Sequence, residues 1–135
     1  MKRLILEKLE KWKQSKRRKP LLLRGARQVG KTWVLKEFGN TFADGFVHID
    51  FDKQVEYRQF FEQTKDVKRI LDNLALATGK KITPKTLIIF DEIQACESAL
   101  NSLKYFYEDA PQYSVVGAGS LLGLKLASGF PVGKV

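Results

Sequence analysis

Apolar residues along the chain follow two spacings, and their order predicts an α/β fold. Short apolar runs of the kind that form strands occur at residues 20–24, 46–51, 86–90 and 113–117. Stretches in which apolar residues recur every three or four positions, as in helices, lie around residues 33–38, 67–74 and 100–107. The run at 86–90 has no polar alternation, which is typical of a parallel strand covered on both faces. We therefore expect a parallel sheet between two layers of helices.

Turn-forming residues mark the ends of the predicted helices. The helix over 67–74 is expected to begin near Asp66 and to close at Gly79. Gly39 and Pro111 are expected to end the helices at 33–38 and 100–107.

The composition is that of an ordinary globular domain. The chain has 135 residues, of which 44% are hydrophobic and 29% charged. No apolar run approaches the roughly 18 residues that would cross a membrane, and the N-terminus lacks the apolar core of a signal peptide. The one cysteine, Cys96, permits no internal disulfide and is expected to be a buried, inert thiol. These features favour a cytoplasmic location without a membrane partner.

Positive charge is concentrated at the N-terminus. Residues 1–19 hold nine Lys or Arg and two Glu, a net of +7 out of +9 for the whole chain. Ile5, Leu9 and Trp12 fall at helical spacing, so we expect residues 1–19 to form a basic amphipathic helix that packs on a second unit, residues 20–135. A nucleic-acid or acidic partner could bind this helix. A solvated helix face is the favoured reading, because no aromatic interleaving or DNA-binding motif accompanies the charge.

The strongest motif lies at residues 25–32, which read Gly-Ala-Arg-Gln-Val-Gly-Lys-Thr. This fits the phosphate-binding loop pattern G-x-x-x-x-G-K-[ST] (Walker A), in which backbone N–H groups face phosphate oxygens. Lys31 is expected to contact the β- and γ-phosphates, and the Thr32 hydroxyl to ligate Mg²⁺. The residues predicted to bind nucleotide are Gly25, Ala26, Arg27, Gln28, Val29, Gly30, Lys31, Thr32 and Trp33.

A second candidate motif (Walker B) follows the apolar strand at 86–90. Asp91 and Glu92 end that strand, and ligands of open α/β sheets bind at the carboxyl ends of strands. Because side chains alternate along a strand, the two acids should diverge and take different tasks. Asp91 is predicted to hold Mg²⁺ through a water molecule, and Glu92 to activate the water that attacks the γ-phosphate. Taken alone, the pair could equally cap the following helix.

Two nearby residues receive no chemical role from the sequence. His48 lies inside the predicted strand at 46–51 and is interpreted as a packing or surface residue, since no Cys/His cluster accompanies it. Gln94 follows the acidic pair and is assigned no function.

The motifs together resemble those of a known family. About 55 residues separate the loop from the acidic pair, which leaves room for a further strand. An intervening strand and a glutamate beside the metal-binding acid resemble the ATPase branch of P-loop proteins, whereas P-loop kinases and GTPases usually lack that glutamate. The resemblance rests on the basic N-terminal helix with Arg-Lys-Pro at 18–20 and on residues 24–32, 89–94 and 117–122. In these parts the chain resembles bacterial and archaeal AAA-type ATPases whose ATPase module precedes a C-terminal domain of poorly defined function.

The resemblance implies a role for Ser120 and a specific fold. Ser120 matches the polar sensor residue that contacts the γ-phosphate, although a hydroxyl in a glycine turn is the alternative. The expected fold is a three-layer α/β/α sandwich with a parallel sheet in the order 1-4-3-2. The fifth strand and the lid are expected to be missing, because family members are longer and this chain stops near residue 135. A fragment and a truncated gene product would both explain that length.

The resemblance also implies a function. We expect Mg²⁺-dependent ATP binding and, in the complete protein, ATP hydrolysis by an AAA-type switch or motor. The alternative is a nucleotide-binding regulatory or interaction module with little hydrolysis, because the missing parts would leave the chain weakly active or inactive. A small-molecule kinase is a third hypothesis, which Glu92 disfavours. Without a fifth strand, the strand at 20–24 would form an exposed edge of the sheet, which favours self-association or a protein partner.

Overall fold

The computed structural model of the protein describes residues 2–15, 19–24, 31–119 and 133–134. Along the chain its elements are α1 (Lys2–Gln14), β1 (Leu21–Arg24), α2 (Lys31–Gly39), β2 (Phe46–Asp50), the 3-10 turn η2 (Val55–Tyr57), α3 (Gln59–Glu62), α4 (Val67–Thr78), β3 (Leu87–Asp91), the 3-10 turn η3 (Ile93–Ala95), α5 (Glu97–Asp109), β4 (Ser114–Gly119) and β5 (Gly133–Lys134).

The strands form one parallel sheet in the order β2-β3-β4-β1-β5. This confirms the predicted order 1-4-3-2 for the first four strands. The sheet also corrects the expectation of a missing fifth strand and an uncovered β1 edge. Gly133 and Lys134 pair with Leu21 and Leu22, so the segment 20–135 does contribute a fifth strand. Sequence patterning misses β5 because it has two residues, and both Gly and Lys are depleted in strands.

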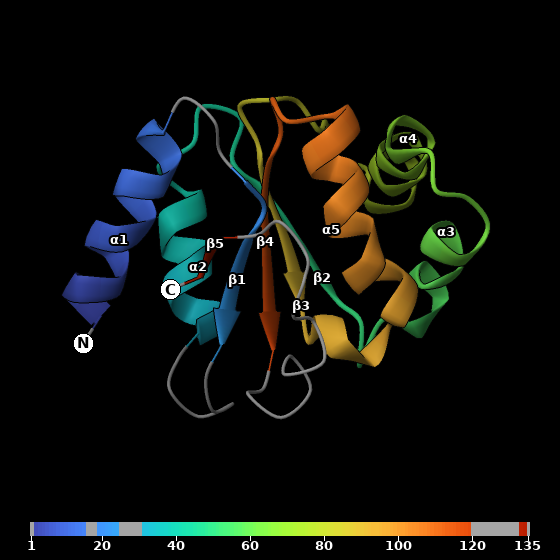
Figure 1. The fold of residues 1–135 in the computed structure, drawn as a ribbon, viewed down its shortest axis with the longest axis horizontal. Coiled ribbons are helices and arrows are strands. Elements are labelled where there is room, and N and C mark those ends of the chain that lie inside the picture. The colour runs from blue at the N-terminus through green and yellow to red at the C-terminus, as the bar shows by residue number, and fades with distance from the viewer. Residues whose placement is uncertain (1, 16–18, 25–30, 120–132, 135) are drawn as a thin grey trace.

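Helices cover both faces of the sheet, as Figure 1 shows: α1 and α2 lie on one side, and α3, α4 and α5 on the other. The alternation of side chains along each strand divides the buried residues into two clusters. Leu87 and Ile89 of β3 belong to the cluster with α1 and α2, whereas Ile88 and Phe90 belong to the cluster with α4 and α5. All four are fully buried, which explains why this strand lacks polar alternation.

The N-terminal helix packs on α2 through its apolar side. Leu9 and Trp12 are buried in the same cluster as Phe38 of α2, and the rings of Trp12 and Phe38 lie 6.3 Å apart. The indole Nε1 of Trp12 also donates a hydrogen bond to the carbonyl of Lys19 at 2.7 Å, which ties the end of α1 to the start of the sheet. Lys8 and Lys11 of the same helix are exposed, so α1 has a buried apolar side and a basic exposed side.

The parallel arrangement brings the carboxyl ends of the strands to one edge of the sheet. Arg24 is paired with Gly119, and Asp50 with Asp91. In Figure 1 these ends point downwards, toward the end of the molecule at which α2 begins. The first turn of α2, which starts at Lys31, therefore lies beside the ends of the central strands.

Candidate nucleotide-binding site

Thr32 and Asp91 come together at the carboxyl edge of the sheet, although 59 positions separate them in the sequence. The Thr32 hydroxyl donates a hydrogen bond to Oδ2 of Asp91 at 2.6 Å. Thr32 lies in the first turn of α2, and Asp91 is the last residue of β3. The two residues predicted to hold Mg²⁺ are thus neighbours.

The strand pattern explains why Asp91 faces α2. Leu87, Ile89 and Asp91 alternate with Ile88 and Phe90, and Ile89 packs in the cluster formed with α1 and α2. A side chain two residues further along the strand lies on the same face. Asp91 therefore lies at the end of the face of β3 that packs against α2, where it places a polar group beside the first turn of that helix. It is only 3% exposed.

His48 also contacts Asp91. Its Nε2 lies 2.9 Å from Oδ2 of the carboxylate, and the two side chains are 18% and 5% exposed. The interpretation of His48 as a packing or surface residue therefore misses a polar contact at the site. Pairing the strand at 46–51 in parallel with β3 could have indicated it, because alternation then places His48 and Asp91 on the same face.

The environment of Asp91 keeps its carboxylate ionised. Burial by itself would raise the pKa of Asp91, but the hydrogen bonds from His48 and Thr32 favour the charged form, as does the backbone amide of Glu92. The net result is a pKa below the ordinary value for aspartate. An oxygen ligand that stays charged at neutral pH is suited to a hard cation such as Mg²⁺.

Glu92 begins a tight turn directly after the strand. Its backbone is left-handed, with φ 48° and ψ 46°, and its amide donates to Oδ1 of Asp91 at 3.0 Å. Its own Oε1 accepts a hydrogen bond from Nε2 of Gln94 at 3.1 Å, and the residue is 8% exposed. The alternation expected for the acidic pair stops at Asp91, because Glu92 lies past the end of β3 in a different backbone conformation. Sequence reasoning also missed Gln94, whose contact depends on this turn.

The other predicted site residues are placed only in part. Gly25, Ala26, Arg27, Gln28, Val29, Gly30 and Ser120 lie outside the described residues. The backbone of Lys31 begins α2, and Trp33 of the same helix is 51% exposed.

Within the described part of the chain, no group of three or more His, Cys, Asp and Glu residues could hold a metal ion. Magnesium commonly takes only one or two protein ligands and completes its shell with phosphate and water. Thr32 and Asp91 would form such a small set of protein ligands. None of the helices that the structure describes has the length and apolar character to cross a membrane.

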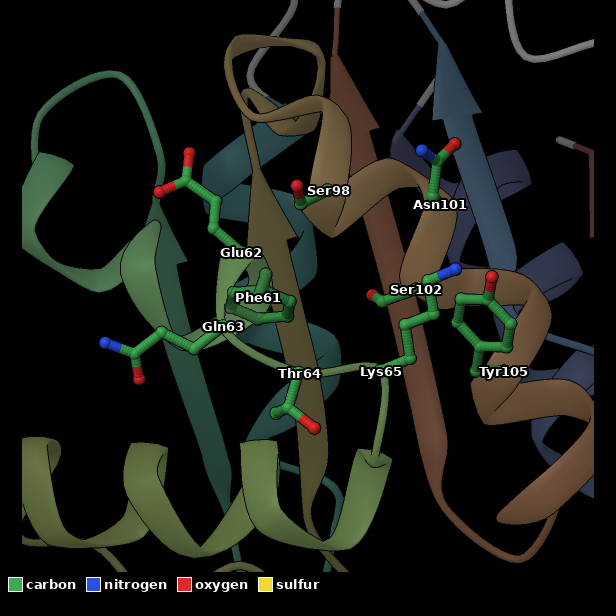
Figure 2. Close-up of a pocket in the computed structure, with 9 residues that line it drawn as sticks. All are labelled: Phe61, Glu62, Gln63, Thr64, Lys65, Ser98, Asn101, Ser102 and Tyr105. Atoms are coloured by element: carbon green, nitrogen blue, oxygen red, sulfur yellow. The ribbon is translucent and has the colours of Figure 1, made fainter.

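A separate cavity of about 460 Å³ lies among the helices on the face of the sheet away from α1 and α2. Its walls come from α3, the adjoining residues 63–65 and one side of α5, as Figure 2 shows. Phe61 and Tyr105 contribute rings to the lining, and Nζ of Lys65 lies 5.8 Å from the centre of the Tyr105 ring. This cavity contains neither Thr32 nor Asp91, so it is distinct from the candidate nucleotide site.

Comparisons with known proteins agree with this architecture. A family model described as an AAA domain matches residues 17–134. The solved structure of PCH-2 from C. elegans superposes with a TM-score of 0.55 and 14% sequence identity, over 99% of this chain and 42% of that chain. At that identity the match shows a shared fold, and this chain spans less than half the length of that structure. No curated protein matches the sequence. Because the family model covers most of its length, the chain belongs to the AAA domain family and is an AAA-type P-loop ATPase module.

Proposed function

We propose that this domain binds ATP with Mg²⁺ and that the complete protein hydrolyses it, as a switch or motor of the AAA type. Membership of the AAA domain family supports nucleotide binding. The observation that carries the finer proposal is the 2.6 Å contact between the Thr32 hydroxyl and the Asp91 carboxylate. It joins the last residue of the loop motif to the acid at the end of β3, as a shared cation site requires.

The residues around this contact supply the ligands for the nucleotide. The backbone of residues 25–30 and the ammonium group of Lys31 would hold the phosphates, while Thr32 and Asp91 would hold Mg²⁺. A hydroxyl and an ionised carboxylate are hard oxygen ligands, which match this cation. When bound, the ion neutralises phosphate charge as the terminal phosphate is transferred to water.

Glu92 is the proposed general base. It follows the proposed metal ligand directly, and its Oε1 is oriented by Gln94 at 3.1 Å. A carboxylate in that position would accept a proton from the attacking water. Ser120 would contact the γ-phosphate from the segment that follows β4.

A nucleotide-binding module that hydrolyses little is the second candidate. The observation that favours it is the state of Glu92, which is only 8% exposed and engaged by Gln94. A base that stays in this contact after ATP binds would not reach water. Single-turnover measurement of phosphate release separates the two: release that depends on Glu92 supports the ATPase, and tight binding without release supports the module.

Self-association is a further element of the proposal. Among the described residues, β5 pairs with Leu21 and Leu22 of β1, and β2 forms the other edge of the sheet. Partly covered strand edges favour pairing with other chains. Light scattering on the purified chain tests this, and a monodisperse monomer at high concentration would contradict it. The basic α1 offers the alternative of nucleic-acid binding, which the same sample can test by titration with DNA.

The decisive test of the proposed function is equilibrium binding of labelled ATP and GTP, with Mg²⁺ and with a chelator. We expect Mg²⁺ to strengthen ATP binding, and Lys31→Ala to abolish it. Lys36→Ala, on the exposed side of the same helix, is the matched control and should bind as the unaltered chain does. Affinity that is unchanged by both Mg²⁺ and Lys31→Ala would refute the proposal.

A further inference from the structure

A single oxygen of Asp91 accepts contacts from two side chains on different elements. Thr32 of α2 reaches Oδ2 at 2.6 Å, and His48 of β2 reaches the same oxygen at 2.9 Å. The other oxygen, Oδ1, accepts the amide of Glu92 at 3.0 Å. The carboxylate is thereby fixed from three directions in a setting from which water is largely excluded.

The pairing of β2 with β3 places His48 within reach. His48 is paired with Ile89, two positions before Asp91, so its imidazole extends along the strands to bridge about 6.6 Å of strand rise. Asp50, which is paired directly with Asp91, is engaged elsewhere: its Oδ1 accepts the amides of Asp52 and Lys53 at 2.9 and 3.2 Å. The side chain of β2 that hydrogen-bonds to the Asp91 carboxylate is therefore that of His48.

Resting on the proposed function, we propose that His48 is a positioning residue for the magnesium site. Its Nε2–H donates to Oδ2 and fixes the rotation of the Asp91 carboxylate, so that this oxygen faces the Thr32 hydroxyl. A neutral imidazole with the proton on Nε2 suffices for this contact, since a carboxylate oxygen only accepts. Partners that orient metal ligands in this way commonly change metal affinity about 10- to 100-fold when they are removed.

A purely structural role for the contact would have a different signature. If His48 only stabilised the fold, its loss would lower the melting temperature and affect nucleotide binding equally with and without Mg²⁺. A positioning role changes the Mg²⁺ requirement and leaves metal-free ATP binding alone. The amount of Mg²⁺ needed for half-maximal strengthening of ATP binding therefore distinguishes the two roles.

The experiment is a Mg²⁺ titration of fluorescent ATP binding to the 135-residue chain and three variants at His48. His48→Leu keeps a similar bulk without a donor, His48→Gln returns an amide donor at the same reach, and His48→Asn carries a donor one bond too short. We expect the Leu and Asn variants to need about tenfold more Mg²⁺, and the Gln variant to match the unaltered chain. Phe46→Leu, two residues earlier on the same face of β2, is the matched control and should not alter the requirement.

Each outcome decides the matter. An unchanged Mg²⁺ requirement in His48→Leu overturns the inference, as does a Gln variant that performs no better than the Asn variant. Because the Gln and Asn variants are both polar amides, that comparison holds even where Leu impairs folding. If the unaltered chain binds ATP equally well in chelator, the proposed function itself fails. If only the variants fail to differ, the proposed function stands and the role of His48 does not.

Discussion

The side-chain amide of Gln94 donates a hydrogen bond to the carboxylate of Glu92 at 3.1 Å, within the short turn that follows β3. The amide oxygen of Gln94 is buried and has no hydrogen-bond partner among the described residues. A buried oxygen without a partner lowers the stability of the fold. The favourable contact that Gln94 makes in this turn is therefore its hydrogen bond to Glu92.

We predict that Gln94→Met lowers turnover about tenfold, because the Glu92 carboxylate loses the amide that orients it. Methionine has a similar size and removes the unsatisfied oxygen, which offsets part of the stability lost with the hydrogen bond. ATP affinity should stay constant, and steady-state phosphate release is the measurement. Gln63→Met, at an exposed glutamine, is the control. Turnover that rises instead would show that Gln94 restrains Glu92 rather than orienting it.

Glu92→Gln should preserve ATP binding and reduce hydrolysis by about 10²- to 10⁴-fold, the range that a general base contributes. The amide keeps the shape of the side chain but cannot take a proton from water. Burst measurements with radiolabelled ATP follow the chemical step directly. Glu97→Gln, at an exposed position in the first turn of α5, should hydrolyse ATP normally. Normal hydrolysis in the Glu92 variant would remove this residue from the mechanism.

Gly39→Ala should destabilise the fold more than Gly79→Ala. A Cβ at Gly39 would lie 2.6 Å from Cβ of Phe46, an atom fixed to the backbone of β2, and overpacking of this kind costs about 1–3 kcal/mol. At Gly79 a Cβ meets nothing within 4 Å, and the cost is that of a left-handed backbone at φ +70°, about 1 kcal/mol. Urea unfolding of both variants tests the difference. Equal losses would contradict the contact assigned to Gly39.

Cys96 should react slowly with thiol reagents in the folded protein. Burial raises the pKa of its thiol, and Glu62 adds to the effect, so the reactive thiolate appears at higher pH than in the unfolded chain. At a pH below the pKa, each unit by which the pKa is raised lowers the fraction of thiolate about tenfold. Labelling rates from pH 7 to 10, with and without denaturant, measure this. A folded-state rate equal to the denatured rate at pH 7 would contradict it.

Local signals in the sequence were sufficient for most of the fold. The helix expected to start near Asp66 and to close at Gly79 does so: Asp66 Oδ1 accepts the amide of Lys68 at 3.1 Å, and Gly79 is left-handed with φ 70°. The four strands were equally predictable: the apolar runs of β1, β3 and β4 are buried on both faces, and β2 alternates buried and half-buried residues. Such signals arise within a few neighbouring residues, so a sequence records them directly.

The parts that escaped prediction depend on pairing between distant segments. β5 has no apolar pattern of its own and exists through its register with Leu21 and Leu22. The contact of His48 with Asp91 requires the register of β2 against β3. The left-handed backbone of Glu92 decides where its carboxylate lies, and nothing in the acidic pair specifies that conformation. The motifs therefore singled out Thr32 and Asp91, which lie together, but not the contacts that His48 and Gln94 make beside them.

The two side chains that contact Asp91 are held in place by different kinds of structure. His48 belongs to a strand paired with β3, so the register of the two strands sets its distance to the carboxylate. Thr32 is carried by α2, which packs on the sheet through buried side chains and is also joined to it by the hydrogen bond from Thr32 to Asp91. A shift of α2 relative to the sheet would therefore change the Thr32 contact and leave the His48 contact unaltered. Asp91 thus links the paired strands of the sheet to the helix that follows the loop motif.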